Sequence, residues 1–164
     1  MAAYTVVRTF TGIVKHIFIA AHNGHVMRVN KYDKEDKAMG HLLADEFGDE
    51  YFVIGTDFYK SRCNLPTASR AKRSNHTFYS HDPLAKASKK CGLTTSYLNL
   101  SKIPTGSPLK QCTTGKVSMG SVGEGYNPLM AVSSRCYCKK ASPETVYDGV
   151  IFVANAHPTH PDED

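Results

Sequence analysis

The sequence predicts an α/β protein in which a mostly parallel sheet is flanked by helices. Two short segments, residues 17–19 and 51–56, are apolar without alternation, which is typical of strands that are covered on both faces. The segment between them, residues 38–47, has apolar residues at helical spacing. A strand, a helix and a second strand in this order almost always form a right-handed crossover between parallel strands.

The chain has 164 residues, of which 41% are hydrophobic. This length can bury one core, so we expect a single domain over residues 1–164. Residues 2–12 are predicted to form a helix, because apolar residues such as Val6 and Phe10 fall at mainly helical offsets. A chain that opens inside a helix is expected to be an incomplete, truncated domain.

The predicted helix over residues 38–47 carries its apolar side chains on one face, which we expect to pack on the sheet. These side chains are Met39, Leu42, Leu43 and Phe47. Asp36 is available to cap the start of the helix, and Gly48 to end it. The preceding residues 27–37 are too polar to bury and are expected to form a surface loop.

A second helix is predicted after a long loop. Residues 58–78 show no hydrophobic period, so we expect a loop there. Asp82 then precedes Pro83, which suits the first position of a helix, and Gly92 is placed to close that helix.

The last third of the chain combines two candidate strands with loops. Residues 96–100 are a candidate third strand, and residues 150–153 form the last buried strand. Between them, residues 101–127 are rich in glycine and proline and are predicted to be a second long loop with one short helix from Leu109. Residues 157–164 are polar and are expected to be a frayed tail.

Composition excludes several classes of partner. The formal net charge is +5, but the basic residues are scattered and form no stripe interleaved with aromatic residues, so no nucleic acid is expected as a partner. No apolar run approaches the roughly 20 residues that span a bilayer, so no membrane is expected as a partner. The five cysteines are an odd number at uneven spacing. This pattern fits reduced thiols and predicts a cytoplasmic location.

Two histidines follow the first predicted strand, in the segment Ala-Ala-His22-Asn23-Gly24-His25-Val. Ligands of open α/β sheets bind beyond the carboxyl ends of the strands, which is where His22 and His25 fall. Gly24 permits a tight turn that brings both imidazoles near one point. We therefore predict a functional site at these histidines; the alternative is that one of them only caps the turn.

Polar residues are also expected at the end of the second strand. Asp57 and Tyr59 come just past residues 51–56 and are predicted to lie on the same edge of the sheet as the histidines. Together with Asn23, they are the predicted substrate-binding residues. His157 and His160 are expected to belong to the tail rather than to a site.

Four segments of the sequence resemble the erythromycin esterase family. They are the block AAHNGHV over residues 20–26, Met39-Gly40 opening a helix, YFVIG over residues 51–55 and YDGVIF over residues 147–152. The order and spacing are those of the family, and the similarity runs from about residue 15 to residue 158. Members of the family are much longer, so the resemblance implies a carboxy-terminal piece of an esterase that lacks its amino-terminal half.

The resemblance implies the hydrolysis of a macrolide lactone, such as that of erythromycin, by a base-activated water, and hence macrolide resistance. Only His22 and His25 match the active-site motif of the family, and the principal base, with its acidic and arginine partners, belongs to the missing half. The expected partners are thus a small-molecule ester or macrolide and that amino-terminal half. No cofactor is expected. The absence of a Gly-x-Ser-x-Gly segment also disfavours a serine nucleophile.

Two alternatives remain open from the residues. One is a metal-dependent hydrolase in which His22 and His25 are ligands, with Asp57 or His41 as the third ligand that catalytic zinc requires. The other is a catalytically inactive remnant or binding module that keeps the cleft without its chemistry. An activity assay separates the second alternative from the enzymes.

Overall fold

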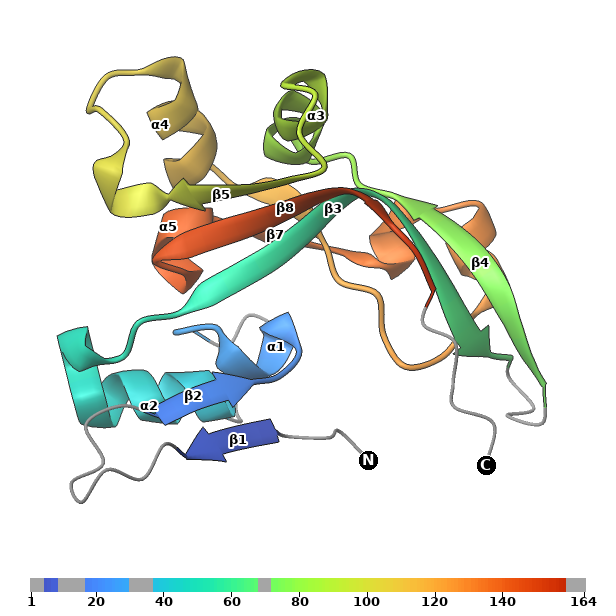
Figure 1. The fold of residues 1–164 in the computed structure, drawn as a ribbon, viewed down its shortest axis with the longest axis horizontal. Helices are drawn as coiled ribbons and strands as arrows, with labels where there is room; N and C mark the ends of the chain where they lie inside the picture. The colour runs from blue at the N-terminus through green and yellow to red at the C-terminus, as the bar shows by residue number, and fades with distance from the viewer. Residues whose placement is uncertain (1–4, 9–16, 30–36, 68–71, 159–164) are drawn as a thin grey trace. The chain divides into compact units, whose positions relative to one another are not determined.

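A computed structural model describes residues 5–8, 17–29, 37–67 and 72–158 (Figure 1). The chain divides into two compact units, residues 1–51 and 52–164, and each is described by itself. The single domain expected over residues 1–164 stays a prediction. No helix in the described ranges has the length and apolar character needed to cross a membrane.

The first unit contains a two-stranded antiparallel sheet and a series of short helices. Its elements are β1 (Thr5–Arg8), β2 (Ile17–Ala20), α1 (Asn23–Val26), α2 (Met39–Phe47) and the 3-10 helix η1 (Gly48–Glu50). In the sheet, Thr5 pairs with Ala20 and Arg8 pairs with Ile17.

The helix predicted over residues 2–12 is wrong where the segment is described, because Thr5–Arg8 is the strand β1. The rest of that segment lies outside the described residues. Threonine and valine lose side-chain freedom in a helix and suit a pleated strand, so local propensity opposes the helical offsets here.

The strand predicted at residues 17–19 is confirmed as β2, but its pairing and burial differ from the prediction. β2 is antiparallel to β1, a pairing that a short connection permits, whereas parallel strands need a longer crossover. Ile17 and Phe18 are 60% and 67% exposed rather than covered. The predicted parallel crossover is not confirmed, since the described sheets pair β2 with β1.

The helix predicted over residues 38–47 is confirmed as α2. Gly48 ends it with φ 51°, a left-handed conformation that favours glycine. Ala38 occupies the N-cap without a side-chain hydrogen bond, and Asp36, the predicted cap, lies outside the described residues. Leu42 and Phe47 on the apolar face of the helix are about half exposed.

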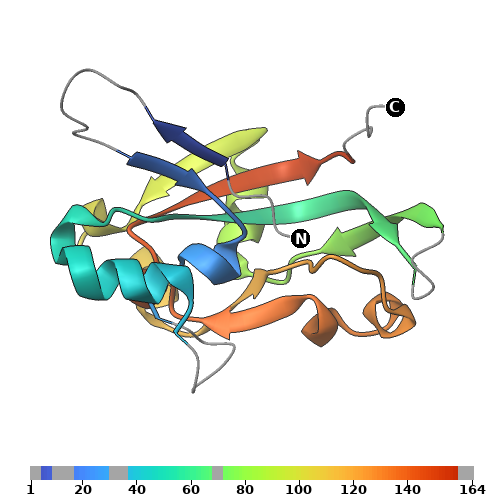
Figure 2. The ribbon, with the colours of Figure 1, turned by 90° about the horizontal axis from the view of Figure 1, so that it is seen from below.

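The second unit is built on a four-stranded sheet with the order β4-β3-β8-β5 (Figures 1 and 2). The strands are β3 (Ile54–Pro66), β4 (Arg73–Tyr79), β5 (Thr95–Asn99) and β8 (Gly149–Ala156). β3 and β8 are parallel, whereas β3–β4 and β5–β8 are antiparallel. The fold is thus mixed α/β, and the mostly parallel sheet predicted from the sequence is corrected to a mostly antiparallel one.

Helices and a smaller sheet complete this unit. The helices are α3 (Pro83–Lys90), α4 (Pro108–Thr114), α5 (Pro143–Val146) and the 3-10 helices η2 (Leu100–Lys102), η3 (Pro128–Ala131) and η4 (Ser134–Cys136). The smaller sheet pairs β6 (Val117–Gly120) with β7 (Cys138–Ala141) in antiparallel fashion. α3 packs against β3 and β8 (Figure 1).

The predicted loop over residues 58–78 is wrong, because most of it forms the hairpin of β3 and β4. Leu65 and Phe78 are buried with Tyr137 and Cys138 in a core cluster. Ser61 occupies an inward position of β3 and is 6% exposed. Because serine is polar, the alternation of apolar and polar residues that indicates a strand is lost at this position.

The loop predicted over residues 101–127 contains more structure than expected. The short helix predicted from Leu109 is confirmed as α4, but β6 was missed. In β6, Val117 and Met119 are buried and flank Ser118, an alternation too short to stand out in the sequence.

Three further predictions are confirmed in this unit. The helix after Asp82 is α3, in which Asp82 Oδ1 accepts a hydrogen bond from the Leu84 amide at 2.9 Å. The candidate strand at residues 96–100 is β5, shifted by one residue. The last buried strand is β8, where Val150 and Phe152 are 0% and 3% exposed.

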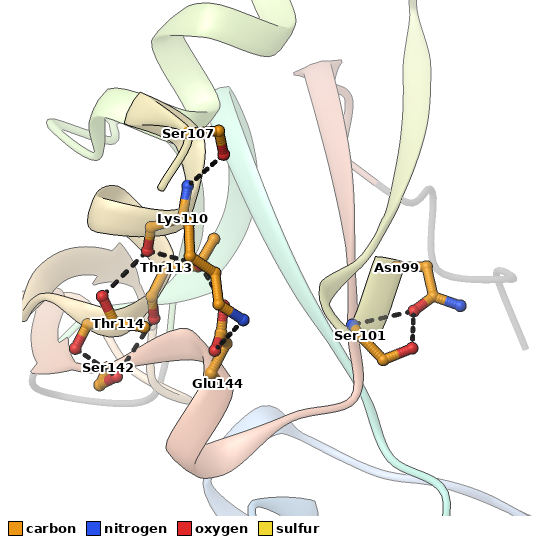
Figure 3. A network of polar contacts seen from close by, with 8 residues as sticks. All are labelled: Asn99, Ser101, Ser107, Lys110, Thr113, Thr114, Ser142 and Glu144. Carbon is orange, nitrogen blue, oxygen red and sulfur yellow. Dashed lines mark hydrogen bonds and ion pairs between the residues drawn. The ribbon is translucent and has the colours of Figure 1, made fainter. Parts of the chain in front are cut away.

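A polar network joins α4 to α5 (Figure 3). Lys110 Nζ donates to Glu144 Oε2 at 2.7 Å, and the hydroxyl of Thr113 donates to Glu144 Oε1. The Ser142 hydroxyl adds bonds to the carbonyls of Thr113 and Thr114, at 3.1 and 2.9 Å. Burial raises the pKa of Glu144, but the bonds from Lys110 and Thr113 outweigh it and hold that pKa below the usual value.

We expect Glu144→Ala to lower the free energy of unfolding by about 1.5–3 kcal/mol, because it removes the hydrogen bonds that Lys110 and Thr113 donate to a charged group. Urea denaturation measures the change. Glu124→Ala is the matched control, since Glu124 is exposed in a loop and surface substitutions usually stay within about 0.5 kcal/mol. Equal stability of the two variants would contradict the role given to this network.

Candidate active site

His22 and His25 lie directly after β2, in the turn that opens α1. His22 is the N-cap of this one-turn helix, and its carbonyl accepts the amide of His25 at 2.8 Å. The two ring centroids are 6.1 Å apart, with an interplanar angle of 72°. The predicted approach of both imidazoles through a tight turn is therefore what the structure shows.

The hydrogen bond within this turn fixes how His22 can act. Its Nδ1 accepts the backbone N–H of Gly24 at 3.2 Å. A neutral imidazole has one donor nitrogen and one acceptor nitrogen, so the proton is on Nε2. The alternative that one histidine caps the turn is thus also correct for His22, whose Nδ1 makes the cap.

Both rings are accessible to different degrees. His22 is exposed and His25 is half-buried. Asn23, between them, is half-buried, and its carbonyl accepts the Met27 amide at 3.1 Å. A substrate-binding role for Asn23 stays a prediction.

The chain after α1 is anchored to the segment that ends the first unit. The Tyr51 hydroxyl donates to the Val26 carbonyl at 2.5 Å, and the Arg28 guanidinium donates to the Tyr51 carbonyl at 2.5 Å. Arg28 also lies over the Tyr51 ring, 5.5 Å from its centroid. Met27 is 3% exposed, so the predicted surface loop over residues 27–37 does not begin at this residue.

Gly40 lets α2 approach α1 closely. A Cβ atom at this position would lie 2.1 Å from the Val26 carbonyl oxygen, which is a backbone atom and cannot swing aside. The glycine of the Met39-Gly40 pair therefore has a packing role, because it allows α2 to support the helix that carries the histidines.

Asp57 and Tyr59 are located within β3 rather than just past its end, because this strand continues to Pro66. Asp57 is 2% exposed, and its Oδ1 accepts the amides of Phe58 and Gly120 at 2.7 and 3.0 Å. Tyr59 is half-buried and makes an edge contact with Tyr79 at 6.4 Å. Their substrate contacts, and their sharing of an edge with the histidines, stay predictions.

The remaining histidines considered from the sequence lie as follows. His41 is on α2, with its Nε2 3.9 Å from Asp45 Oδ1 one turn later. His157 is exposed after β8, and His160 lies outside the described residues.

Sequence reasoning missed a neighbour of Asp57. Burial and the side chain of Asp82 raise the pKa of Asp57 to about 8. Asp82 had been recognised only as the cap of α3. No signal in the sequence relates the two residues, because the fold of β3 and α3 brings them together.

We expect Gly40→Ala to lower the free energy of unfolding by about 1–3 kcal/mol, because its Cβ overpacks the contact between α1 and α2. Thermal unfolding measures the change. Gly123→Ala is the control, since a Cβ there meets nothing within 4 Å. A Gly40→Ala protein as stable as the control would rule out the close approach of the two helices.

The hydrogen bond from Gly24 gives a second prediction, on the tautomer of His22. Nitrogen-detected NMR of the labelled chain near neutral pH should show His22 with its proton on Nε2 and an unprotonated Nδ1. Exposed His157 provides the reference for a ring outside the turn. A proton on Nδ1 of neutral His22 would contradict the arrangement.

The chain is similar to a known protein family in sequence and to two solved structures in fold. A sequence profile of the erythromycin esterase family matches residues 1–156. No curated protein sequence matches the chain. A crystal structure of a Bacillus cereus protein superimposes with a TM-score of 0.72 at 19% identity, over 87% of this chain and 34% of that one.

A second crystal structure, of a succinoglycan biosynthesis protein, has a TM-score of 0.68 at 15% identity, over 85% of this chain and 33% of that one. At these identities the two structures show a shared fold. The chain spans about a third of the length of either. The profile match covers nearly all of this chain, and the chain therefore belongs to the erythromycin esterase family.

Proposed function

We propose that this chain supplies two histidines to a site that hydrolyses an ester by attack of an activated water. The observation that carries the proposal is the His22–His25 pair, held by one helical turn with ring centroids 6.1 Å apart. Membership of the erythromycin esterase family suggests a hydrolase-like function. A macrolide lactone is the proposed substrate, and macrolide resistance is the proposed consequence of its hydrolysis. The cytoplasm is the proposed location of the protein.

The tautomer of His22 suggests its role in this chemistry. Attack of water on an ester carbonyl places negative charge on the carbonyl oxygen, and a preorganised donor at that oxygen stabilises the transition state. We assign this role to the Nε2–H of His22, because its Nδ1 accepts the Gly24 amide. His25 lies close enough to contact the same small group. Removal of the proton from water is assigned to another base.

We propose that this base comes from the amino-terminal half of a longer family protein. The chain spans about a third of the two structures with its fold, which is consistent with a site assembled from two parts. Ile17 and Phe18 of β2, just before the histidines, are largely exposed. These apolar side chains are candidates for burial against that half.

The same hydrogen bond weighs against the metal-dependent alternative. A ligand nitrogen must offer a lone pair to the metal. If Nε2 of His22 did so, the proton of the neutral ring would move to Nδ1 and face the N–H of Gly24. Two N–H donors, Nδ1–H and the Gly24 amide, would then face each other. Ligation of a metal through Nε2 would therefore remove the hydrogen bond that caps the turn.

We expect the chain alone to show no hydrolysis of erythromycin above background, and hydrolysis to appear when the amino-terminal half of a macrolide-hydrolysing relative is supplied. Loss of a base together with other preorganised groups leaves almost no catalysis, since one oxyanion donor alone is typically worth about 2.7–4 kcal/mol. Mass spectrometry of the opened lactone measures the activity. Turnover by the isolated chain would contradict the two-part site.

In the complemented protein, His22→Ala or His25→Ala should lower kcat/KM at least about tenfold, or roughly 1.4 kcal/mol. His157→Ala is the control, because His157 is exposed after the last strand. Chelators should leave the activity unchanged. Activity that chelators remove and zinc restores would favour the metal-dependent hydrolase, and no activity with any half would favour the inactive binding module.

A further inference from the structure

Two buried carboxyl groups of the second unit interact with each other, and the described residues form no ion pair with either of them. Asp57 comes from β3 and Asp82 from the N-cap of α3, and they are 2% and 0% exposed. The two side chains lie within hydrogen-bonding reach of each other.

The four carboxyl oxygens of the pair are used unequally. Asp57 Oδ1 accepts the amides of Phe58 and Gly120 at 2.7 and 3.0 Å, and Asp82 Oδ1 accepts the Leu84 amide at 2.9 Å. Each Oδ2 is buried and accepts no hydrogen bond from the described part of the chain. A buried oxygen without a donor is costly. A proton held between the two carboxyl groups would bridge them and give both Oδ2 atoms a partner.

The charged and titratable groups around the pair do not supply that bridge. Lys86 is on the next turn of α3 and is exposed. The thiol of Cys138 on β7 is buried, and its burial and the nearby Asp57 raise its pKa to about 11, so it stays neutral. His81, next to Asp82 in the chain, is exposed. Two carboxylates this close and this buried do not both ionise near neutral pH.

We propose that Asp57 and Asp82 share one proton, which is carried on Asp57 Oδ2 and donated to Asp82 Oδ2, so that an acid–carboxylate hydrogen bond ties β3 to the start of α3. Burial raises the pKa of Asp82 as well, but the Leu84 amide, the bond with Asp57 and the charge of Lys86 lower it. We assign the charge to Asp82 because it also caps the positive end of a helix, which favours a carboxylate. Asp57 has no helix end beside it, and both of its backbone donors use Oδ1. Its Oδ2 is therefore free to hold the proton.

The bond makes the stability of the second unit depend on pH. Burial and the bond with Asp82 raise the pKa of Asp57 to about 8, from 3.8 for an ordinary aspartate. Between these values the folded chain holds a proton that the unfolded chain releases. The stabilisation is thus complete below about pH 4 and is lost as the pH rises through about 8. The start of α3 is then released from β3 in alkaline solution.

The test compares the whole chain with Asp57→Asn between about pH 5 and 9. An asparagine has the shape of a protonated aspartate, and its amide can donate to Asp82 Oδ2 without a titratable proton. We expect the melting temperature of the parent to fall across this range and that of Asp57→Asn to stay nearly constant. Asp49→Asn, at an exposed position of η1, is the control and should follow the parent.

Infrared spectroscopy provides a second readout that does not depend on stability. At pH 7, the parent and Asp49→Asn should show the carbonyl stretch of one protonated carboxyl group, which Asp57→Asn should lack. A parent without this band, or an unchanged pH slope in Asp57→Asn, would overturn the proposal. Stabilisation of the parent at pH 9 by Mg²⁺ or Ca²⁺, absent in Asp57→Asn, would also overturn it, because a cation would then be the bridge.

Discussion

The second unit depends on the burial of β8 between two neighbouring strands. β8 pairs in parallel with β3 and in antiparallel fashion with β5, so its backbone groups are satisfied on both edges. Val150 and Phe152 fill its inner face and are almost fully buried. This pairing fixes the first half of β3, while the second half pairs with β4. Asp57 lies in the half that β8 holds, and the rigid pairing there keeps its carboxyl at the start of α3.

Local signals in the sequence predicted several of the elements, and they predicted the partners of those elements poorly. The cap of α3 depends on Asp82 and Pro83, which are neighbours in the chain, and it formed as expected. Continuous apolar runs indicate a strand but carry no direction, so they could not show that β5 is antiparallel to β8. The hairpin of β3 and β4 was missed because an inward position is taken by Ser61, which no hydrophobic pattern reveals.

In the candidate site, too, local features were predictable from the sequence and long-range contacts were not. The pair of histidines was predictable because both residues lie in one turn of the chain. The support from Gly40 and Tyr51 was not predictable in physical terms, because it requires the packing of α1 against α2 and a contact across 25 residues of chain. The relation between Asp57 and Asp82 likewise exists only after two elements have met.

The free cysteines differ in exposure, so their reactivity with a thiol reagent reports local opening of the second unit. Cys91 and Cys136 are exposed free thiols, whereas Cys138 is buried in the core cluster under the hairpin. A thiol reagent can therefore reach the first two in the folded state, but it reaches Cys138 only during excursions in which this cluster separates. The rate at which Cys138 is modified therefore measures how often this cluster opens. No added probe is needed to follow local opening of the second unit.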